Sequence, residues 1–496
     1  MTGNRGGDTT MVRGGRLVDP YGVREGDILI EDGVISAVGT VKAPANATEL
    51  DASGDFVAAG LINSHYHSGE NFNPGLYENL PLDLWFVHSH QVTRTEPPSP
   101  DVIYARTMLG AMLMLRAGTT SCVDFLYEAP GITLETLEPV VEAYRDAGIR
   151  ATILMGVADR SFAESLPLND DEAREWADEA ETPSLDAILE IGRAAVDRWH
   201  DPDGMIGIGW GPSAPQRCSP ELVEETMRMA RARGLVWQTH VLETRTQVMT
   251  SREWHEGSSF VEVLGSRGLL GPETTLVHTI WLTDRDIELI AETSTTAVHC
   301  LASNLRLGDG IARLPAMRDA GVRVALGTDG RGCDETLDVL ELARLTATVH
   351  KARGGDRAAW PTAAQALAMA TRDASLCTGH GERLGRIEPG CRADLLVLNG
   401  ASATFTPTND VVRQLVFGGR PSDIKSVVVD GETVVQDGEL TRIDEAEMLA
   451  AANQHAASEA KLLADPARRQ RLERIVEGVY RRAEAYQSPV DAYVPS

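Results

Sequence analysis

Residues 205–241, MIGIGWGPSAPQRCSPELVEETMRMARARGLVWQTHV, contain one complete unit of strand, helix and strand. The runs MIGIGWGPS and LVWQTHV have the composition of buried strands, and the stretch between them has an amphipathic helical pattern. Ser219 is the expected N-cap, Pro220 the first helical residue and Gly234 the C-terminal stop. This unit predicts an α/β protein with a parallel sheet.

The same alternation extends from residue 56 to residue 329 and gives eight strand-like runs. The runs end at or near His65, Asp124, Gly156, Ser213, His240, His278, His299 and Asp329. Two intervening helices also end on a glycine directly before the next run, at Gly148 and Gly321, as a short connection requires. Eight such units close into a (β/α)8 barrel, or TIM barrel, and we predict this fold class.

The segments on either side of the barrel have a different pattern. Residues 26–39 and 422–438 each contain apolar strand-like runs around an Asp-Gly pair, which is a strong β-hairpin signal. We therefore expect residues 10–58 and 386–440 to form one small β-sandwich. The barrel, residues 59–385, interrupts this second unit.

Two further segments belong to neither unit. Residues 159–190 are polar and acidic and predict an insertion after the third strand, more typical of a solvated surface helix than of an active-site lid. Residues 441–496 are rich in Ala, Glu and Arg and predict a C-terminal helical extension. The pattern of the extension indicates no function.

Composition excludes several classes of protein. The chain has 496 residues, and its 73 acidic against 46 basic side chains leave a formal charge of −27, which argues against nucleic acid as a partner. No run approaches the roughly 18 apolar residues of a membrane helix, so we expect a cytoplasmic protein without a membrane partner. The six cysteines form no C-x-x-C pair, which predicts reduced, buried thiols.

Histidine and aspartate side chains stand at the predicted strand ends, where a barrel carries its active site. His65 and His67 are two residues apart, so the alternation of a strand directs both to one side. His240, His278 and Asp329 end three other strands at the same rim. Imidazoles and a carboxylate suit Zn²⁺ with one position left for water. The sequence therefore predicts a metal site.

Longer motifs extend this pattern and carry a resemblance. The runs AGLINSHYH, QTHVLE, LVHTIWL, VHCLASNLRLGDG and VALGTDG resemble the amidohydrolase superfamily, in particular the branch with cytosine and guanine deaminases, methylthioadenosine and S-adenosylhomocysteine deaminases, and triazine hydrolases. RLGRIEPGCRADLLVL and VVVDGETVVQDG are similar to the C-terminal β-domain of that superfamily. The resemblance covers nearly the whole chain and is specific for the superfamily but not for a substrate.

The resemblance implies a site with a single metal. Members with two metals typically bridge them with a carbamylated lysine on the fourth strand, and no lysine lies between Lys42 and Lys351. A rarer Glu or Cys bridge stays open, although MIGIGWGPS contains neither. The implied ligands of one Zn²⁺ per chain, with Fe²⁺ as the alternative, are His65, His67, His240 and Asp329.

The resemblance also implies roles in catalysis. In the similar deaminases, the glutamate that matches Glu243 moves protons to the ring nitrogen of the substrate. Asp329 is expected to accept the proton of the attacking water. His278 is expected to orient that water, and whether it also contacts the metal stays open.

Other polar residues near the strand ends are assigned no chemistry. The pair His88 and His90 has the spacing of the first ligand pair but follows LWFV, and we expect ordinary helix or loop there. His299 ends the seventh strand and is expected to have a supporting role. Ser303 and Asn304 are expected to shape their loop.

The candidate pocket residues are Glu70, Asn71, Trp85, Ser213 and Trp281. In the similar adenosine-type deaminases, a glutamate before the matching tryptophan holds the ribose hydroxyls, and a histidine of the fourth-strand segment meets the nucleoside. The matching positions here are Leu84 and Ser213, so we expect poor binding of nucleosides. A shift of one residue in this alignment would give Asp83 the acceptor role.

The predicted function is hydrolytic deamination of a nitrogen heterocycle such as a purine, pterin, pyrimidine or triazine. The predicted partner is this small molecule, and we expect a homodimer or larger homo-oligomer. One alternative is displacement of chloride or an alkylamine from a triazine-like ring, which Gly330, directly after Asp329, disfavours. A catalytically silent scaffold is the other alternative, but every expected ligand is present.

Overall fold

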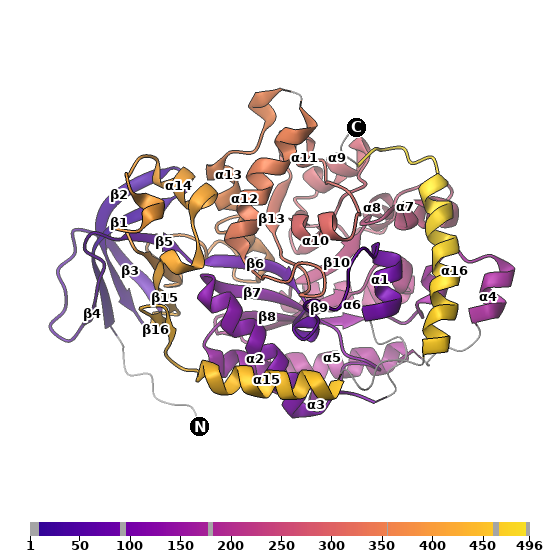
Figure 1. Ribbon diagram of the computed structural model, residues 1–496, viewed down its shortest axis with the longest axis horizontal. Coiled ribbons are helices and arrows are strands. Elements are labelled where there is room, and N and C mark those ends of the chain that lie inside the picture. Colours follow the sequence, from indigo (N-terminus) through magenta and orange to yellow (C-terminus); the bar gives the residue numbers. More distant parts are fainter. Residues whose placement is uncertain (1–8, 90–95, 177–181, 355, 460–465, 493–496) are drawn as a thin grey trace.

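A parallel eight-stranded barrel forms the centre of the protein (Figure 1). The computed structural model describes residues 9–89, 96–176, 182–354, 356–459 and 466–492. The barrel strands are β6 (Leu61–Tyr66), β7 (Thr119–Leu126), β8 (Arg150–Val157), β9 (Ile206–Pro212), β10 (Trp237–Val241), β11 (Thr274–His278), β12 (Thr296–His299) and β13 (Arg323–Leu326). Each pairs in parallel with the next. The Asp329 N–H donates to the His65 carbonyl (3.0 Å) and joins the last strand to the first. The predicted TIM barrel is confirmed.

Helices follow the barrel strands and surround them. They are α2 (Pro100–Arg116), α3 (Leu134–Ala147), α5 (Leu185–Trp199), α6 (Pro220–Arg233), α7 (Arg245–Trp254), α8 (Phe260–Ser266), α9 (Asp284–Glu292), α10 (Leu301–Arg306), α11 (Leu314–Asp319), α12 (Val339–Val349) and α13 (Ala363–Met369). Helix α6 has the predicted ends: the Ser219 hydroxyl accepts from the Leu222 N–H, and Gly234 adopts a left-handed φ of +66°.

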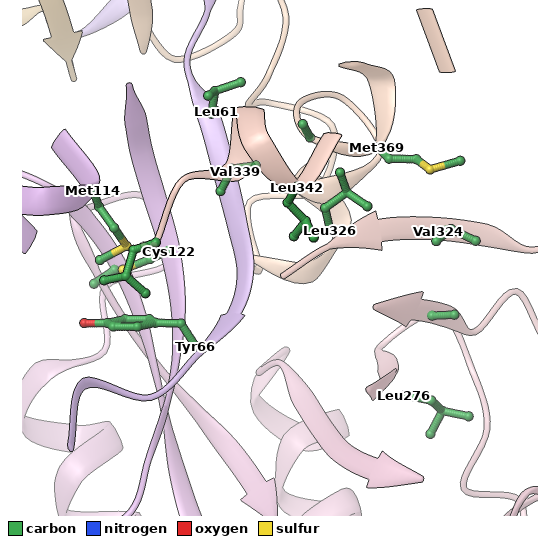
Figure 2. Close-up of a cluster of buried hydrophobic side chains, with 14 of the residues drawn as sticks. Leu61, Tyr66, Met114, Cys122, Leu276, Val324, Leu326, Val339, Leu342 and Met369 are labelled. Atoms are coloured by element: carbon green, nitrogen blue, oxygen red, sulfur yellow. The ribbon is translucent and has the colours of Figure 1, made fainter. Parts of the chain in front are cut away.

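Apolar side chains fill both faces of the barrel wall. Ile62, Val123, Phe125, Leu154, Val277, Val298 and Ala325 form a buried cluster contributed by six of the barrel strands. On the outer face, Leu326 packs with Val339 and Leu342 of α12 (Figure 2). Each such burial contributes roughly 1.5–3 kcal/mol relative to an exposed side chain. All six cysteines are free and buried, as predicted.

A second, mixed sheet is built from both ends of the chain. Its nine strands are β1 (Thr9–Asp19), β2 (Gly22–Glu31), β3 (Val34–Gly39), β4 (Thr48–Asp51), β5 (Phe56–Ala59), β14 (Leu395–Leu398), β15 (Ile424–Val429), β16 (Glu432–Gln436) and β17 (Glu439–Leu440). It encloses an apolar core of its own. Both predicted hairpins form, and their Asp-Gly turns have positive φ throughout, at Asp32-Gly33 and Asp430-Gly431.

The predicted first strand, residues 56–65, is divided between the two sheets. Strand β5 pairs with β14 in the small sheet, and β6 pairs with β7 in the barrel. Gly60 lies at the changeover, where a Cβ atom would stand 2.1 Å from Thr120 Oγ1. The fully buried Arg150 of β8 also joins the units, because it donates to Asp394 (3.1 and 3.2 Å) and Asp430 (3.0 Å) of the small-sheet region.

In the described part of the chain, five further helices lie outside the repeating units: α1 (Leu82–Ser89), α4 (Asp170–Trp176), α14 (Val411–Gly418), α15 (Glu445–Glu459) and α16 (Pro466–Ala485). Helix α15 packs on α2, whereas α16 packs on α1, α7 and α4 (Figure 1). The two helices of the C-terminal extension therefore contact different parts of the barrel. A search of the described ranges finds no helix long and apolar enough to cross a membrane.

Candidate metal and substrate site

Four histidine rings gather at the carboxyl ends of β6, β10 and β11. Each uses its Nδ1 to contact an oxygen: His65 with Gln238 Oε1 (2.6 Å), His67 with the Phe125 carbonyl (2.6 Å), His240 with the Ser213 carbonyl (2.6 Å) and His278 with Asn304 Oδ1 (2.9 Å). Because these oxygens only accept, the proton lies on Nδ1. When a ring is neutral, its Nε2 atom therefore keeps its lone pair for another partner.

Two groups of ligand atoms meet at this point. The ligand atoms of His65, His67 and His240 lie within 4.8 Å of one another, and those of Glu243, His278 and Asp329 do the same. Asp329 joins the groups, because its Oδ1 lies 3.2 Å from His67 Nε2 and 3.7 Å from His65 Nε2. The barrel thus brings together every residue that the sequence predicts for the metal and for catalysis.

These residues fit a divalent metal ion. The Nε2 atom of His65 is buried and has no hydrogen-bond partner, and such atoms are rare because leaving them unpaired costs free energy. It stands with two further imidazoles and a carboxylate, a donor set that a borderline cation prefers. The donor chemistry, with each Nδ1 already engaged, is that of a metal centre.

Burial and mutual charge shift the protonation of the site. Burial and the neighbouring His67 hold the pKa of His65 well below its usual value. Burial is the largest influence on His67 and opposes its charged form, but the hydrogen bond with Asp329 and the charges of Asp329 and Glu70 together outweigh burial and raise the pKa to about 9. Burial, followed by the charges of Asp309 and Asp329, raises the pKa of Glu243 well above its usual value.

The backbone is strained at the same strand ends. Leu242, His278 and Asp329 have φ values of +50°, +67° and +66°, in the left-handed region that costs a non-glycine residue about 1–3 kcal/mol. Gly330 follows Asp329, and a Cβ atom there would lie 1.9 Å from Glu70 Oε2. Gly330 therefore makes room for the Glu70 carboxylate beside the cluster.

A cavity opens from the cluster, and three of the five candidate pocket residues line it: Glu70, Trp85 and Ser213. Asn71 lies outside its lining, because its amide is buried and donates to the Arg106 carbonyl (2.9 Å). Trp281 also lies outside the lining and donates from Nε1 to the Asp309 carbonyl (2.9 Å). Both of these side chains pack into the surrounding structure.

The helical geometry of α1 determines which of the residues before Trp85 faces the cavity. Asp83 lines it and accepts a hydrogen bond from the Thr246 hydroxyl (2.5 Å). Leu84 is turned away and packs in an apolar cluster with helix α16. The expectation that Leu84 excludes nucleosides was therefore based on the wrong residue, because neighbouring residues of a helix point about 100° apart.

Sequence reasoning missed Gln238 and expected Ser303 and Asn304 only to shape their loop, but all three side chains orient the site. Gln238 holds His65, Asn304 holds His278, and the Ser303 hydroxyl donates to Asp329 Oδ2 (2.7 Å). A signal exists for Gln238, since it precedes His240 by two residues on one strand and shares its face. Ser303 and Asn304 lie on the short helix α10, which the sequence pattern did not reveal.

The insertion and the remaining histidines are placed as follows. Phe162 and Leu166 of the insertion line the cavity, so its first part is a cavity wall and not only the predicted surface helix. The ring of His299 contacts the ring of His350 in a tilted arrangement (centroids 5.5 Å apart, interplanar angle 38°), and His299 is absent from the two ligand groups found in the described ranges. His88 lies in α1, and His90 is outside the described residues.

Comparison with known proteins adds a family. Residues 56–434 match the amidohydrolase family. The chain is 30% identical over 440 residues to the 5'-deoxyadenosine deaminase of Methanothermobacter thermautotrophicus, covering 88% of this chain and 96% of that one. It is 34% identical over 452 residues to the 5-methylthioadenosine/S-adenosylhomocysteine deaminase of Halobacterium salinarum, covering 90% and 97%.

Two solved structures are similar along nearly their whole length. An adenosine deaminase from Xanthomonas campestris with bound zinc has a TM-score of 0.80 and 26% identity, covering 91% of this chain and 98% of that one. An atrazine chlorohydrolase from Arthrobacter aurescens TC1 complexed with zinc has a TM-score of 0.82 and 25% identity, covering 90% and 100%.

Proposed function

The chain belongs to the amidohydrolase family, and from this premise we propose that it is a metal-dependent hydrolytic deaminase that releases ammonia from the adenine ring of a nucleoside. The observation that carries the proposal is that two groups of possible metal ligands and catalytic residues meet at the base of one cavity. The first group is His65, His67 and His240, and the second is Glu243, His278 and Asp329. The named activities of the similar proteins support the reaction and the adenine nucleoside.

We propose that one cation per chain is held by His65, His67, His240 and Asp329, and that it is zinc. The donor set and the zinc of the two similar solved structures support this assignment. When bound, such a cation supplies a water nucleophile at neutral pH, because it lowers the pKa of water to about 7.

The chain's own residues move the protons. Asp329 accepts a proton as the water oxygen bonds to the ring carbon that bears the amino group, and His278 orients that water. Glu243 donates its proton to the adjacent ring nitrogen. Asp329 then protonates the amino group, the carbon–nitrogen bond breaks and ammonia leaves. Glu243 takes the remaining hydroxyl proton, which leaves a ring carbonyl and restores the starting state, with Glu243 protonated and Asp329 ionised.

Asp83 supports the choice of a nucleoside. Its carboxylate lines the cavity, where it can accept hydrogen bonds from sugar hydroxyls, each of which would cost about 1–3 kcal/mol if buried unpaired. Six buried free thiols support a reducing, cytoplasmic location. Assembly as a homo-oligomer stays a prediction.

Product analysis tests the function. Purified, zinc-loaded protein is given 5'-deoxyadenosine, 5-methylthioadenosine, adenine or atrazine, and released ammonia and chloride are measured. We expect ammonia from the two nucleosides at a kcat/KM of at least about 10⁴ M⁻¹s⁻¹. Turnover of adenine alone, or chloride from atrazine without ammonia from a nucleoside, would contradict the proposal.

A further inference from the structure

The last helix of the described chain packs against the loops that wall the cavity. One face of α16 carries Leu472, Ile475, Val476, Val479 and Ala483, at the spacing of an amphipathic helix. This face shares an apolar cluster with Val87 of α1, Met249 of α7 and the insertion residues Phe162, Leu166 and Trp176. Figure 1 shows α16, in yellow, between α1 and α4.

The cluster shares side chains with the cavity. Phe162 and Leu166 belong to the cluster and also line the cavity. Phe86 of α1 lines the cavity as well and stacks on Phe162, with ring centroids 4.5 Å apart and an interplanar angle of 14°. A movement of α16 would therefore displace the cavity wall, because closely packed side chains transmit displacement.

Arg482 attaches α16 to this wall through polar contacts. Its Nη1 and Nη2 donate to the two carboxylate oxygens of Glu172 (2.6 and 2.8 Å), and Nη2 also donates to the Pro167 carbonyl (3.0 Å). Pro167 directly follows Leu166 of the cavity lining. Such a two-pronged contact fixes direction as well as distance.

Glu172 is suited to accept the hydrogen bonds from Arg482. Its side chain is only 15% exposed, and it also accepts from the Asn169 N–H (2.9 Å), which fixes the turn before α4. Burial raises the pKa of Glu172, but the hydrogen bonds from Arg482 and Asn169 outweigh burial and leave it below its usual value. The carboxylate is therefore charged at neutral pH and keeps its partner.

We propose that Arg482 is a positioning residue that holds residues 162–172 as a wall of the cavity, so that α16 sets the affinity for the substrate beyond the reacting ring. This inference rests on the proposed function, which supplies the reaction to be measured. The wall presents the apolar Phe162 and Leu166, so the part of the nucleoside that contacts it is an apolar substituent on the sugar. The reacting ring contacts the strand ends and is independent of α16.

Steady-state kinetics of Arg482→Ala test the role. We expect the KM for 5-methylthioadenosine to rise at least about fivefold while kcat changes less than about twofold, because the lost contact acts on binding and not on the reacting atoms. The double variant Arg482→Glu with Glu172→Arg should return KM to within about twofold of the parent, since it restores an ion pair.

Arg481→Ala is the matched control. Arg481 is the neighbouring arginine on the same helix, but its Nε donates to Glu477 within α16 (2.8 Å), and its side chain is 76% exposed. We expect its KM to stay unchanged. An equal rise of KM in both variants would overturn the role of Arg482, because general loss of positive charge would then explain the effect.

Hydrogen exchange gives a readout that does not depend on turnover. Amides of residues 162–176 should exchange faster in Arg482→Ala than in Arg481→Ala, with unchanged metal content in both. If Arg482→Ala changes neither the exchange of these amides nor KM, the inference about Arg482 is overturned. Deamination by the parent protein would still support the proposed function in that case. If the parent releases no ammonia from any nucleoside, the proposed function fails, and the exchange data alone decide whether Arg482 holds the wall.

Discussion

The two ends of the cavity are built in different ways. At its base, the ligand groups come from the ends of four barrel strands, β6, β10, β11 and β13, or from the residues directly after them. At its outer end, the wall comes from α1 and the insertion, supported by α16. Strand ends of a barrel hold chemistry rigidly, whereas loops vary without disturbing it. The chemistry and the substrate preference of this protein are therefore separable.

Asp329→Asn should have the largest effect, because it removes both the proposed proton acceptor and one proposed anionic metal donor at the base. We expect kcat to fall at least about 10³-fold, with weaker zinc binding. Ammonia release and metal content by elemental analysis measure both. Retention of more than about a tenth of the parent activity would show that another group accepts the proton.

Glu243→Gln separates chemistry from metal binding within the base. The variant keeps the size and shape of the side chain but loses the transferable proton, so kcat should fall at least about 10²-fold with zinc content and fold unchanged. Circular dichroism and elemental analysis provide the controls. Loss of zinc together with activity would instead show that Glu243 is a metal ligand. Residues of both groups at the base would then hold the metal.

Asp83→Ala tests the outer part of the cavity. The variant should raise KM for 5'-deoxyadenosine about tenfold or more while kcat changes little, because it leaves sugar hydroxyls unpaired. Leu84→Ala, one residue later, turned away from the cavity and packed on the α16 cluster, should raise KM less than Asp83→Ala does. If Leu84→Ala has the larger effect on KM, the helix presents the other residue to the substrate.

The sequence predicted the barrel well because its strands are short apolar runs separated by capped helices. All eight runs correspond to barrel strands. The predicted start of the first barrel strand was wrong, because Phe56–Ala59 joins the small sheet and the chain changes sheets at Gly60. The apolar run around the changeover contains no turn residue other than Gly60. Composition alone therefore does not show where the chain passes from the small sheet to the barrel.

The two ends of the cavity also differed in predictability. Positions such as His65 and His67 follow from strand alternation, which fixes the direction of each side chain. The outer residues depend on how loops and helices pack: Asp83 and Leu84 differ by one helical position, and Trp281 and Asn71 turned out to be packing residues. The contribution of α16 depends on contacts between segments about 300 residues apart in sequence, such as Glu172 and Arg482, which no local pattern reveals.

A zinc titration of chelator-treated protein, followed by ammonia release from 5'-deoxyadenosine, tests the central claim most directly. A metal centre with one set of ligands predicts almost no ammonia without zinc and a linear rise that ends at about one equivalent per chain. Full activity without added metal, or a rise that continues to about two equivalents, would contradict a deaminase built on this single cluster.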